Sequence, residues 1–234
     1  MEDTPTTPTV DARLVHIPID GVTLTGDLTT PPRAQGLIVF AHGSGSSRLS
    51  PRNRYVAGEL QRAHLATLLF DLLTPSEEQA DLRTGRLRFD IPFLAERLGA
   101  ATDWVIREPG LWPLGVGYFG ASTGAAAALV AAAQRPGVVR AIVSRGGRPD
   151  LAGDALDRVA CPTLLIVGGN DAPVIELNRE ALPRLRGHAE LAIVPGATHL
   201  FEEPGALEEV ARRATRWFAH YLAPQRAARE RDPW

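Results

Sequence analysis

GYFGASTGAAAALV, residues 117–130, places Ser122 between two glycines, where an apolar run meets an alanine-rich segment. The apolar run is typical of a buried strand, and the alanines that follow favour a helix. In a tight strand-to-helix turn a serine is exposed as a nucleophile, and glycines two residues away on each side let strand and helix approach closely. The same serine could instead only cap the helix, because serine is a common N-cap residue.

Six short apolar runs, one of them the run that precedes Ser122, predict a sheet. They are residues 36–41, 66–71, 114–119, 139–144, 163–168 and 190–195. Continuous apolar runs are typical of parallel strands buried on both faces. Helical patterns alternate with them, at residues 51–64, 93–108, 122–134, 173–185 and 204–222. This alternation predicts an α/β fold, a doubly wound sheet with helices on both faces.

The ends of the chain are predicted to lie outside a single domain at residues 13–222. Residues 1–12 are rich in Thr and Pro and are expected to be flexible, and residues 223–234 are expected to form a charged tail. Asp20 and Gly21 stand between two alternating segments at the start of the domain. That arrangement predicts an N-terminal antiparallel hairpin.

Two connections bear on access to a site. The polar stretch at 74–90 is longer than typical connections between helices and strands. Residues 145–162 leave room for only a loop and about one short helix. We therefore expect no large lid.

The composition excludes several function classes. All 25 basic residues are arginines, since the chain of 234 residues contains no lysine. A Walker-type phosphate loop, a Schiff-base enzyme and a Ser–Lys pair are therefore excluded, because each needs an amine. The single Cys161 excludes a disulfide framework and a thiolate zinc site.

Partners and location are predicted from charge and hydropathy. The net charge of −2 gives no field that would attract nucleic acid or an anionic membrane. The longest apolar run, residues 125–133, is far shorter than the ~18 to 20 residues that span a bilayer. The acidic first residues lack an apolar signal core. We expect a cytoplasmic monomer or small homo-oligomer that uses no metal and no cofactor.

Three polar residues follow separate apolar runs, at the edge where a parallel sheet binds ligands. Ser122, Asp171 and His199 occur in that order. They suit the roles of nucleophile, orienting acid and general base. Asp171 could also be an ordinary turn residue beside Asn170, and Asp150 is the competing acid.

The turn HGSGSS, residues 42–47, could supply an oxyanion hole. We expect the backbone amides of Ser44 and Thr123 to be the two donors. His42 is expected to have a positioning role rather than to transfer protons. A glycine-rich phosphate cradle is the alternative, which the missing lysine disfavours.

Candidate substrate-binding residues surround this edge and are His42, Gly43, Arg48, Arg52, Ala121 and Leu200. Arg48, Arg52 and Arg54 follow the glycine-rich turn closely. Such arginines are usually solvated, but an arginine fork could also recognise a substrate carboxylate or phosphate.

Five motifs together resemble the α/β-hydrolases, and within them the dienelactone hydrolase-like group. They are FAHGSGSSRLSPRN (40–53), LLFDLL (68–73), GYFGASTGAAAAL (117–129), LLIVGGNDAPV (164–174) and VPGATHLFEEPG (194–205). The resemblance implies an eight-stranded, mostly parallel sheet and a triad on Ser122, Asp171 and His199. The chain is also similar to the hydrolase unit found fused to phosphoribosyltransferases, although no second domain is expected in these residues.

One departure from the family pattern bears on the substrate. Dienelactone hydrolases proper use cysteine where this chain has Ser122, which favours an ordinary carboxylic ester over dienelactone. The sequence thus predicts a cofactor-free serine esterase that acts on small esters through an acyl-enzyme. An acyltransferase or perhydrolase would use the same triad, and a non-catalytic ligand-binding α/β-hydrolase fold is the alternative from another class.

Overall fold

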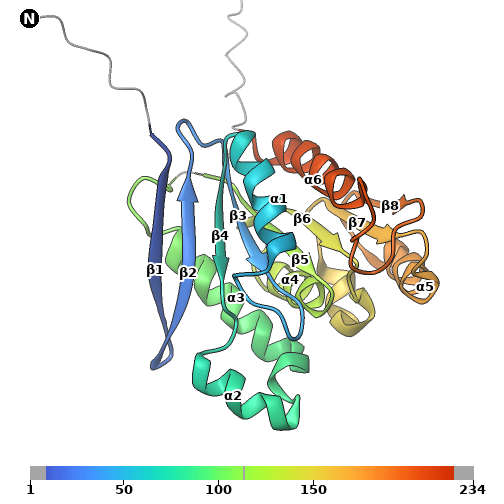
Figure 1. Ribbon diagram of the computed structural model, residues 1–234, viewed down its shortest axis with the longest axis horizontal. Coiled ribbons are helices and arrows are strands. Elements are labelled where there is room, and N and C mark those ends of the chain that lie inside the picture. The colour runs from blue at the N-terminus through green and yellow to red at the C-terminus, as the bar shows by residue number, and fades with distance from the viewer. Residues whose placement is uncertain (1–8, 113, 224–234) are drawn as a thin grey trace, which may run out of the picture.

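The computed structural model describes residues 9–112 and 114–223, which form an eight-stranded sheet flanked by helices (Figure 1). In spatial order the strands are β1 (Asp11–Ile19), β2 (Val22–Thr30), β4 (Leu65–Phe70), β3 (Gly36–Ala41), β5 (Val116–Ala121), β6 (Val139–Arg145), β7 (Thr163–Gly168) and β8 (Ala189–Val194). The β1–β2 and β2–β4 pairs are antiparallel, and the other neighbours are parallel. The predicted mostly parallel sheet is confirmed.

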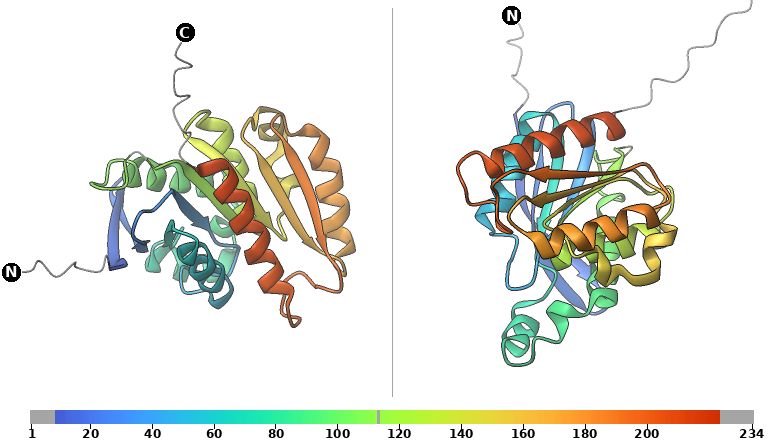
Figure 2. Two further views of the ribbon diagram at one scale, coloured as in Figure 1. Left: turned by 90° about the horizontal axis from the view of Figure 1, so that it is seen from above. Right: turned by 90° about the vertical axis from the view of Figure 1, so that its right-hand side faces the viewer.

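Helices cover both faces of the sheet (Figure 2). On one face α1 (Pro51–Arg62) packs against α6 (Ala206–Leu222), and on the other α3 (Ile91–Val105) packs against α4 (Thr123–Gln134). The short helix η2 (Pro149–Arg158) packs against both α4 and α5 (Ala172–Ala181). The single-turn helix η3 (Leu182–Arg184) follows α5 in the chain. Only η2 lies between β6 and β7, so no large lid is inserted there.

Alternating strand residues fill two apolar layers, one on each face. Leu37 and Val39 of β3 belong to the layer under α3 and α4, whereas Ile38 and Phe40 belong to the layer under α1 and α6. Because both faces are covered, every residue of β3 is buried. This double burial is the reason why the parallel strands are continuous apolar runs in the sequence.

The predicted hairpin is present and begins earlier than expected. Asp20 and Gly21 both have positive φ, 42° and 84°, as a two-residue type I′ turn requires. Asp11 and Ala12 pair with β2, so β1 begins two residues before the predicted domain boundary at Arg13. Residues 1–8 of the predicted flexible segment, and residues 224–234 of the predicted tail, lie outside the described residues.

The polar stretch 74–90, treated in the sequence as a long connection, is mostly helical. It contains α2 (Pro75–Thr84) and the single-turn helix η1 (Leu87–Phe89). The Thr74 side chain accepts a hydrogen bond from the Glu77 amide, while the Glu77 carboxylate accepts one from the Thr74 amide. This capping box starts α2. In the part of the chain that the structure describes, no helix is long and apolar enough to cross a bilayer.

Candidate active site

Ser122 lies in a strained turn between β5 and α4. Its backbone has φ 50° and ψ −120°, a conformation that residues other than glycine rarely adopt. The Ser122 amide donates to the Arg145 carbonyl at 3.2 Å, and the Ser122 carbonyl accepts from the amides of Ala125 and Arg148. The surrounding backbone therefore holds the strained turn in place.

The two glycines that flank Ser122 are required by close backbone packing. A Cβ at Gly120 would lie 2.4 Å from the Cα of Ala125, and a Cβ at Gly124 would lie 2.2 Å from the Ala41 carbonyl oxygen. Only glycine fits at these distances. The spacing of the two glycines therefore has the physical cause that the sequence suggested: strand, helix and turn meet at Ser122.

Asp171 and His199 form a short hydrogen bond. Asp171 follows β7, and its Oδ2 lies 2.7 Å from Nδ1 of His199, which follows β8. The Asp171 side chain is 13% exposed and that of His199 is 38% exposed. Asp150, the competing acid, forms a bidentate pair with Arg148 instead. The structure therefore brings His199 to Asp171 rather than to Asp150.

A two-residue stretch at the end of β6 connects Ser122 to His199. The carbonyl of Arg145 binds the Ser122 amide, and a Cβ on the next residue, Gly146, would lie 3.4 Å from the His199 ring. Among the described residues no hydrogen bond joins Ser122 to His199 themselves, and such bonds are often long before substrate binds. The three candidate residues thus share one edge of the sheet.

Ser44 and Thr123 are in contact, but through a different atom from the one expected. The Ser44 amide donates to the Thr123 side-chain oxygen Oγ1 at 2.9 Å. Thr123 is the first residue of α4, so its own N–H has no partner within the helix. One expected oxyanion donor is therefore open, and the other is hydrogen-bonded to a hydroxyl group that can rotate.

His42 holds the glycine-rich turn against the end of β4. Its Nδ1 lies 3.0 Å from the Gly43 carbonyl oxygen, and its Nε2 accepts from the Leu72 amide at 3.1 Å. One neutral tautomer makes both bonds, and burial lowers the pKa of His42. A Cβ at Gly43 would lie 3.1 Å from the Cβ of Ser122, so this turn lies directly against the candidate nucleophile.

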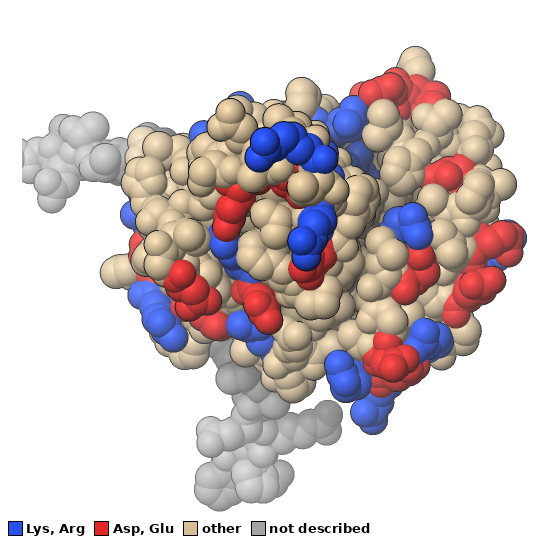
Figure 3. All heavy atoms as spheres, turned by 90° about the horizontal axis from the view of Figure 1, so that it is seen from below, with Lys and Arg blue, Asp and Glu red and all other residues tan. Residues whose placement is uncertain are grey.

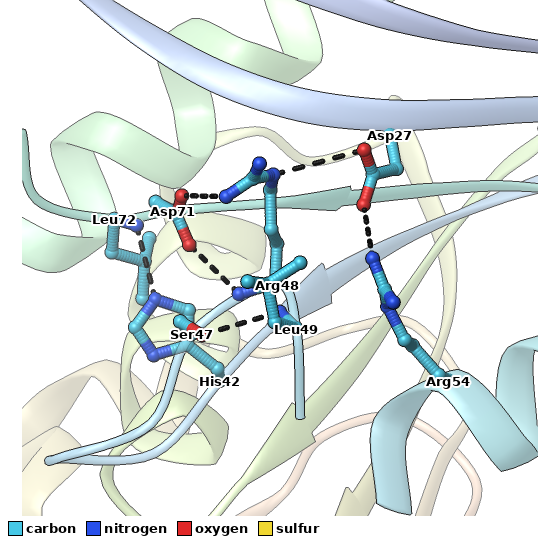
Figure 4. A network of polar contacts seen from close by, with 8 residues as sticks. All are labelled: Asp27, His42, Ser47, Arg48, Leu49, Arg54, Asp71 and Leu72. Atoms are coloured by element: carbon cyan, nitrogen blue, oxygen red, sulfur yellow. Dashed lines mark hydrogen bonds and ion pairs between the residues drawn. The ribbon is translucent and has the colours of Figure 1, made fainter. Parts of the chain in front are cut away.

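The arginines that follow the turn are largely neutralised within the protein (Figure 4). Arg48 binds Asp71 through its amide and its guanidinium, both at 2.8 Å, and lies 3.7 Å from Asp27. Asp27 also binds Arg54 at 3.0 Å. The alternative in which these arginines bind a substrate anion is therefore not favoured for Arg48 and Arg54, because both have carboxylate partners within the protein.

The remaining candidate residues are placed as follows. Arg52 binds Glu202, which lies three residues after His199, at 2.9 Å. Ala121 is buried at the end of β5, and Leu200 is 40% exposed beside His199. In the face seen from below, basic and acidic side chains alternate without a field of one sign (Figure 3).

A cavity of about 110 Å³ opens beside the oxyanion residues. It reaches Ser44 and Thr123, and its apolar wall includes Leu72, Leu73 and Leu94. Helix α2 contributes Leu82 to this wall and Glu78 to the polar part of the lining. The helical segment that the sequence had treated as a connection therefore covers one side of the site. Ser122 and His199 are not among the lining residues, so the cavity adjoins them rather than containing them.

Sequence reasoning missed the role of α2 and the environment of Arg145. The Thr-x-x-Glu pattern at residue 74, followed by proline, was a readable start signal for α2. Arg145 ends an apolar run and is 8% exposed. A charged residue at the end of a buried strand was the available signal. Among the described residues, no group of three or more histidine, cysteine or acidic residues could hold a metal.

Comparison with known proteins agrees with this architecture. Residues 65–223 match the dienelactone hydrolase family. A crystal structure of dienelactone hydrolase from Anabaena variabilis ATCC 29413 is 60% identical, with a TM-score of 0.89, over 91% of this chain and 99% of that one. The protein has an α/β-hydrolase fold. Within that class, it belongs to the dienelactone hydrolase family.

Two further relatives define how far the comparison reaches. Est1E from Butyrivibrio proteoclasticus has a TM-score of 0.75 at 16% identity, over 89% of this chain and 98% of that one, and shows the fold alone. A putative phosphoribosyl transferase of Mycobacterium tuberculosis (strain H37Rv) is 57% identical over 208 residues, 89% of this chain. The match covers 46% of that relative, so the chain spans about half its length. Membership of the dienelactone hydrolase family supports a hydrolase.

Proposed function

We propose that the protein is a serine hydrolase that cleaves small carboxylic esters through an acyl-enzyme. The observation that carries this proposal is the 2.7 Å contact between His199 and Asp171, at the same edge of the sheet as the strained turn of Ser122. Backbone strain of this kind costs free energy and persists only where the surrounding structure holds it. It is therefore found mainly at functional sites. Family membership supports hydrolysis, and the geometry of the site supports a mechanism with a Ser–Asp–His triad.

In the first half of the reaction, His199 accepts the proton of Ser122 at Nε2 while Ser122 attacks the acyl carbon. Asp171 accepts the hydrogen bond from Nδ1–H and stabilises the imidazolium that forms. The proton then passes to the leaving alkoxide, and the alcohol departs. In the second half, His199 activates a water molecule, which releases the acid and restores Ser122.

The developing oxyanion is stabilised at the N-terminus of α4. The Thr123 amide, which has no partner within the helix, lies at the N-terminus of α4. The helix dipole favours negative charge at that end. The Ser44 amide supplies a second donor when the Thr123 side chain rotates and releases it. The contact between Ser44 and Thr123 keeps the glycine-rich turn beside Ser122 before substrate arrives.

The cavity beside Thr123 favours a compact substrate. Its volume is about 110 Å³, and α2 limits it on one side. The phosphoribosyl transferase name belongs to relatives about twice as long as this chain, and no such activity is part of the proposal.

A chain-length series of para-nitrophenyl esters tests the proposal. We expect the acetyl to butyryl esters to be turned over faster than long-chain esters. We also expect Ser122→Ala to lose about 10⁴-fold or more in kcat, as is typical when a triad member is removed. The mechanism is wrong if Ser122→Ala keeps wild-type activity while circular dichroism shows that it is folded.

A further inference from the structure

Strand β8 is an edge of the sheet, and half of its backbone groups point away from the protein. It is last in the spatial order of strands and pairs in parallel with β7, in a regular register (Figure 1). The carbonyls of His188 and Val194 both accept hydrogen bonds from the side of β7. Backbone groups alternate in direction along a strand. The N–H and C=O groups that point outward therefore belong to Ala189, Leu191 and Ile193.

The other edge strand, β1, is protected against pairing with a further strand, whereas β8 is not. Strand β1 contains Pro18 and the charged residues Asp11 and Arg13. Prolines and charges on an edge strand are common devices that prevent pairing between molecules. Strand β8 has the sequence AELAIV, in which Glu190 is the one charged residue. An unprotected apolar edge of this kind can pair with another strand.

Strand β8 is complementary to itself in an antiparallel register. With a two-fold axis at Leu191, this residue lies opposite its own copy, and Ala189 lies opposite Ile193 of the second copy. These are the pairs in which facing residues exchange both N–H···O bonds, so every outward group of β8 finds a partner. Leu191 and Ile193 are partly buried against Val174 and Ile175 of α5, and apolar side chains would therefore meet on this face.

Aromatic rings flank β8 on its other face. A groove of about 310 Å³ between β8 and α6 is lined in part by Trp217 and Tyr221, whose rings lie 4.8 Å apart. Trp217 also stacks on His188 at 5.6 Å. It is 7% exposed, and among the described residues its Nε1 has no hydrogen-bond partner. Tryptophan, tyrosine and arginine are enriched at the centres of protein interfaces.

The charges along this groove are complementary across the same two-fold axis. Glu190, whose side chain is 56% exposed, forms the β8 wall, and Arg213 and Arg216 lie on the α6 wall. In the register centred on Leu191, Glu190 lies opposite Ala192 of the second copy, which belongs to the layer under α6. The carboxylate of each copy is therefore directed to the α6 wall of the other. Opposite charges on facing surfaces favour one register over others.

We propose that β8 is a dimer interface, at which two copies of this chain pair antiparallel around Leu191 and join their sheets. The occupant of the free edge is thus a second copy of the chain. A two-fold contact of this kind uses the same surface on both copies, so it closes at two subunits. The dimer is independent of the proposed hydrolase chemistry, because none of the candidate catalytic residues takes part in the pairing.

The mass of the purified protein in solution tests the dimer. Sedimentation velocity over a micromolar dilution series is expected to show twice the mass of one chain. Leu191→Lys places two like charges opposite each other at the axis, and we expect it to raise the Kd of the dimer by about tenfold or more. Leu14→Lys is the matched control, because Leu14 is 57% exposed on the other edge strand. It should leave the Kd unchanged.

A wild-type protein that is monomeric throughout this series overturns the proposal. The edge would then be bare, or covered by a different protein. A dimer that is equally stable in Leu191→Lys also overturns it, because the interface would then lie elsewhere.

Disulfide cross-linking tests the register. Facing residues of a hydrogen-bonded antiparallel pair have Cα atoms about 5.5 Å apart, within the range of about 4.4–6.8 Å that a disulfide spans. In a Cys161→Ala background, Leu191→Cys is expected to give a covalent dimer on mild oxidation, whereas Leu14→Cys is not. Cross-linking that is equally poor in both variants would contradict pairing around Leu191.

Amide hydrogen exchange gives a readout in the unmodified protein. In a single chain the amides of Leu191 and Ile193 point outward, whereas that of Ala192 is directed to β7. We expect all three to be protected in the wild-type dimer, and only Ala192 to stay protected in Leu191→Lys. If circular dichroism shows that this variant does not fold, Ala189→Lys replaces it, since Ala189 is partly exposed and lies opposite Ile193. Fast exchange at Leu191 and Ile193 in the wild-type protein refutes the interface.

Discussion

The two sides of Ser122 use arginine in opposite ways. On the side of α2, Arg48 is bound by Asp71 and Asp27, and the result is a fixed turn. On the side of α1 and α6, Arg145 is buried without a partner among the described residues. Arg48 has its charge neutralised within the protein, whereas Nε and Nη1 of Arg145 keep hydrogen-bonding capacity that the described residues do not use. A similar difference separates Asp150, which is bound by Arg148, from Asp171, which is hydrogen-bonded to His199.

After Ser122→Ala, the largest effect is expected from Asp171→Asn. Asparagine has a similar size, but its amide group would donate to Nδ1 and favour the wrong tautomer of His199. We expect kcat/KM for a neutral ester to fall by about 10³- to 10⁴-fold. Asp150→Asn is the matched control, and its activity should stay within a few-fold of the wild-type value. Equal losses in the two variants would remove the distinction between the two acids.

The next largest loss of activity is expected when the contact between Ser44 and Thr123 is removed. Thr123→Val keeps the shape of the side chain but removes the oxygen that accepts from Ser44. We expect kcat to fall by about 10- to 100-fold, because small misplacement of a catalytic donor is costly. Thr123→Ser should retain most of the activity. A valine variant as fast as the wild-type protein would show that the hydroxyl has no part in placing the Ser44 amide.

Substitutions of the paired arginines Arg48 and Arg54 are expected to change mainly the stability of the protein. Arg48→Met removes a donor from Asp71, and both side chains are only 22% exposed. We expect a loss of about 1.5–3 kcal/mol in the free energy of unfolding, the usual range for hydrogen bonds to charged groups. Arg54→Met should cost about 0–1 kcal/mol, since its side chain is 53% exposed. Urea unfolding measures both, and the reverse order would contradict this assignment.

The smallest of these effects is a dependence of stability on pH that arises from His42. Because burial lowers its pKa, the unfolded chain takes up a proton at His42 before the folded protein does. Stability is therefore expected to fall as the pH drops through about 6.5, the ordinary pKa of histidine. His42→Gln should show a shallower fall between neutral and mildly acidic pH. Parallel curves for the two proteins would mean that His42 does not titrate in this way.

Much of the fold could be predicted from the sequence, because the strands of a covered parallel sheet are continuous apolar runs. The runs at 36–41 and 163–168 coincide with β3 and β7. Helix α2 was not predicted from the sequence, because its residues are mostly polar on every side and Asp81 is its one buried residue. Periodicity cannot reveal a helix of that kind, and only its capping box could.

The candidate site was partly predictable for a related reason. Ser122, Asp171 and His199 each follow an apolar run, so the sheet topology brings them to one edge. The state of each arginine was not predictable, because it depends on which carboxylates the fold places nearby. Arg48 resembled a free surface arginine in the sequence and is paired, whereas Arg145 resembled the end of a strand and has no side-chain partner among residues 9–112 and 114–223.

The most direct test of the central claim is covalent labelling of the folded protein with a fluorophosphonate, followed by mass spectrometry of its peptides. The account predicts one modified residue, Ser122, and loss of labelling in Ser122→Ala. It also predicts much slower labelling in Asp171→Asn than in Asp150→Asn. A folded wild-type protein that remains unlabelled would contradict the claim and would favour a non-catalytic, ligand-binding role for the fold.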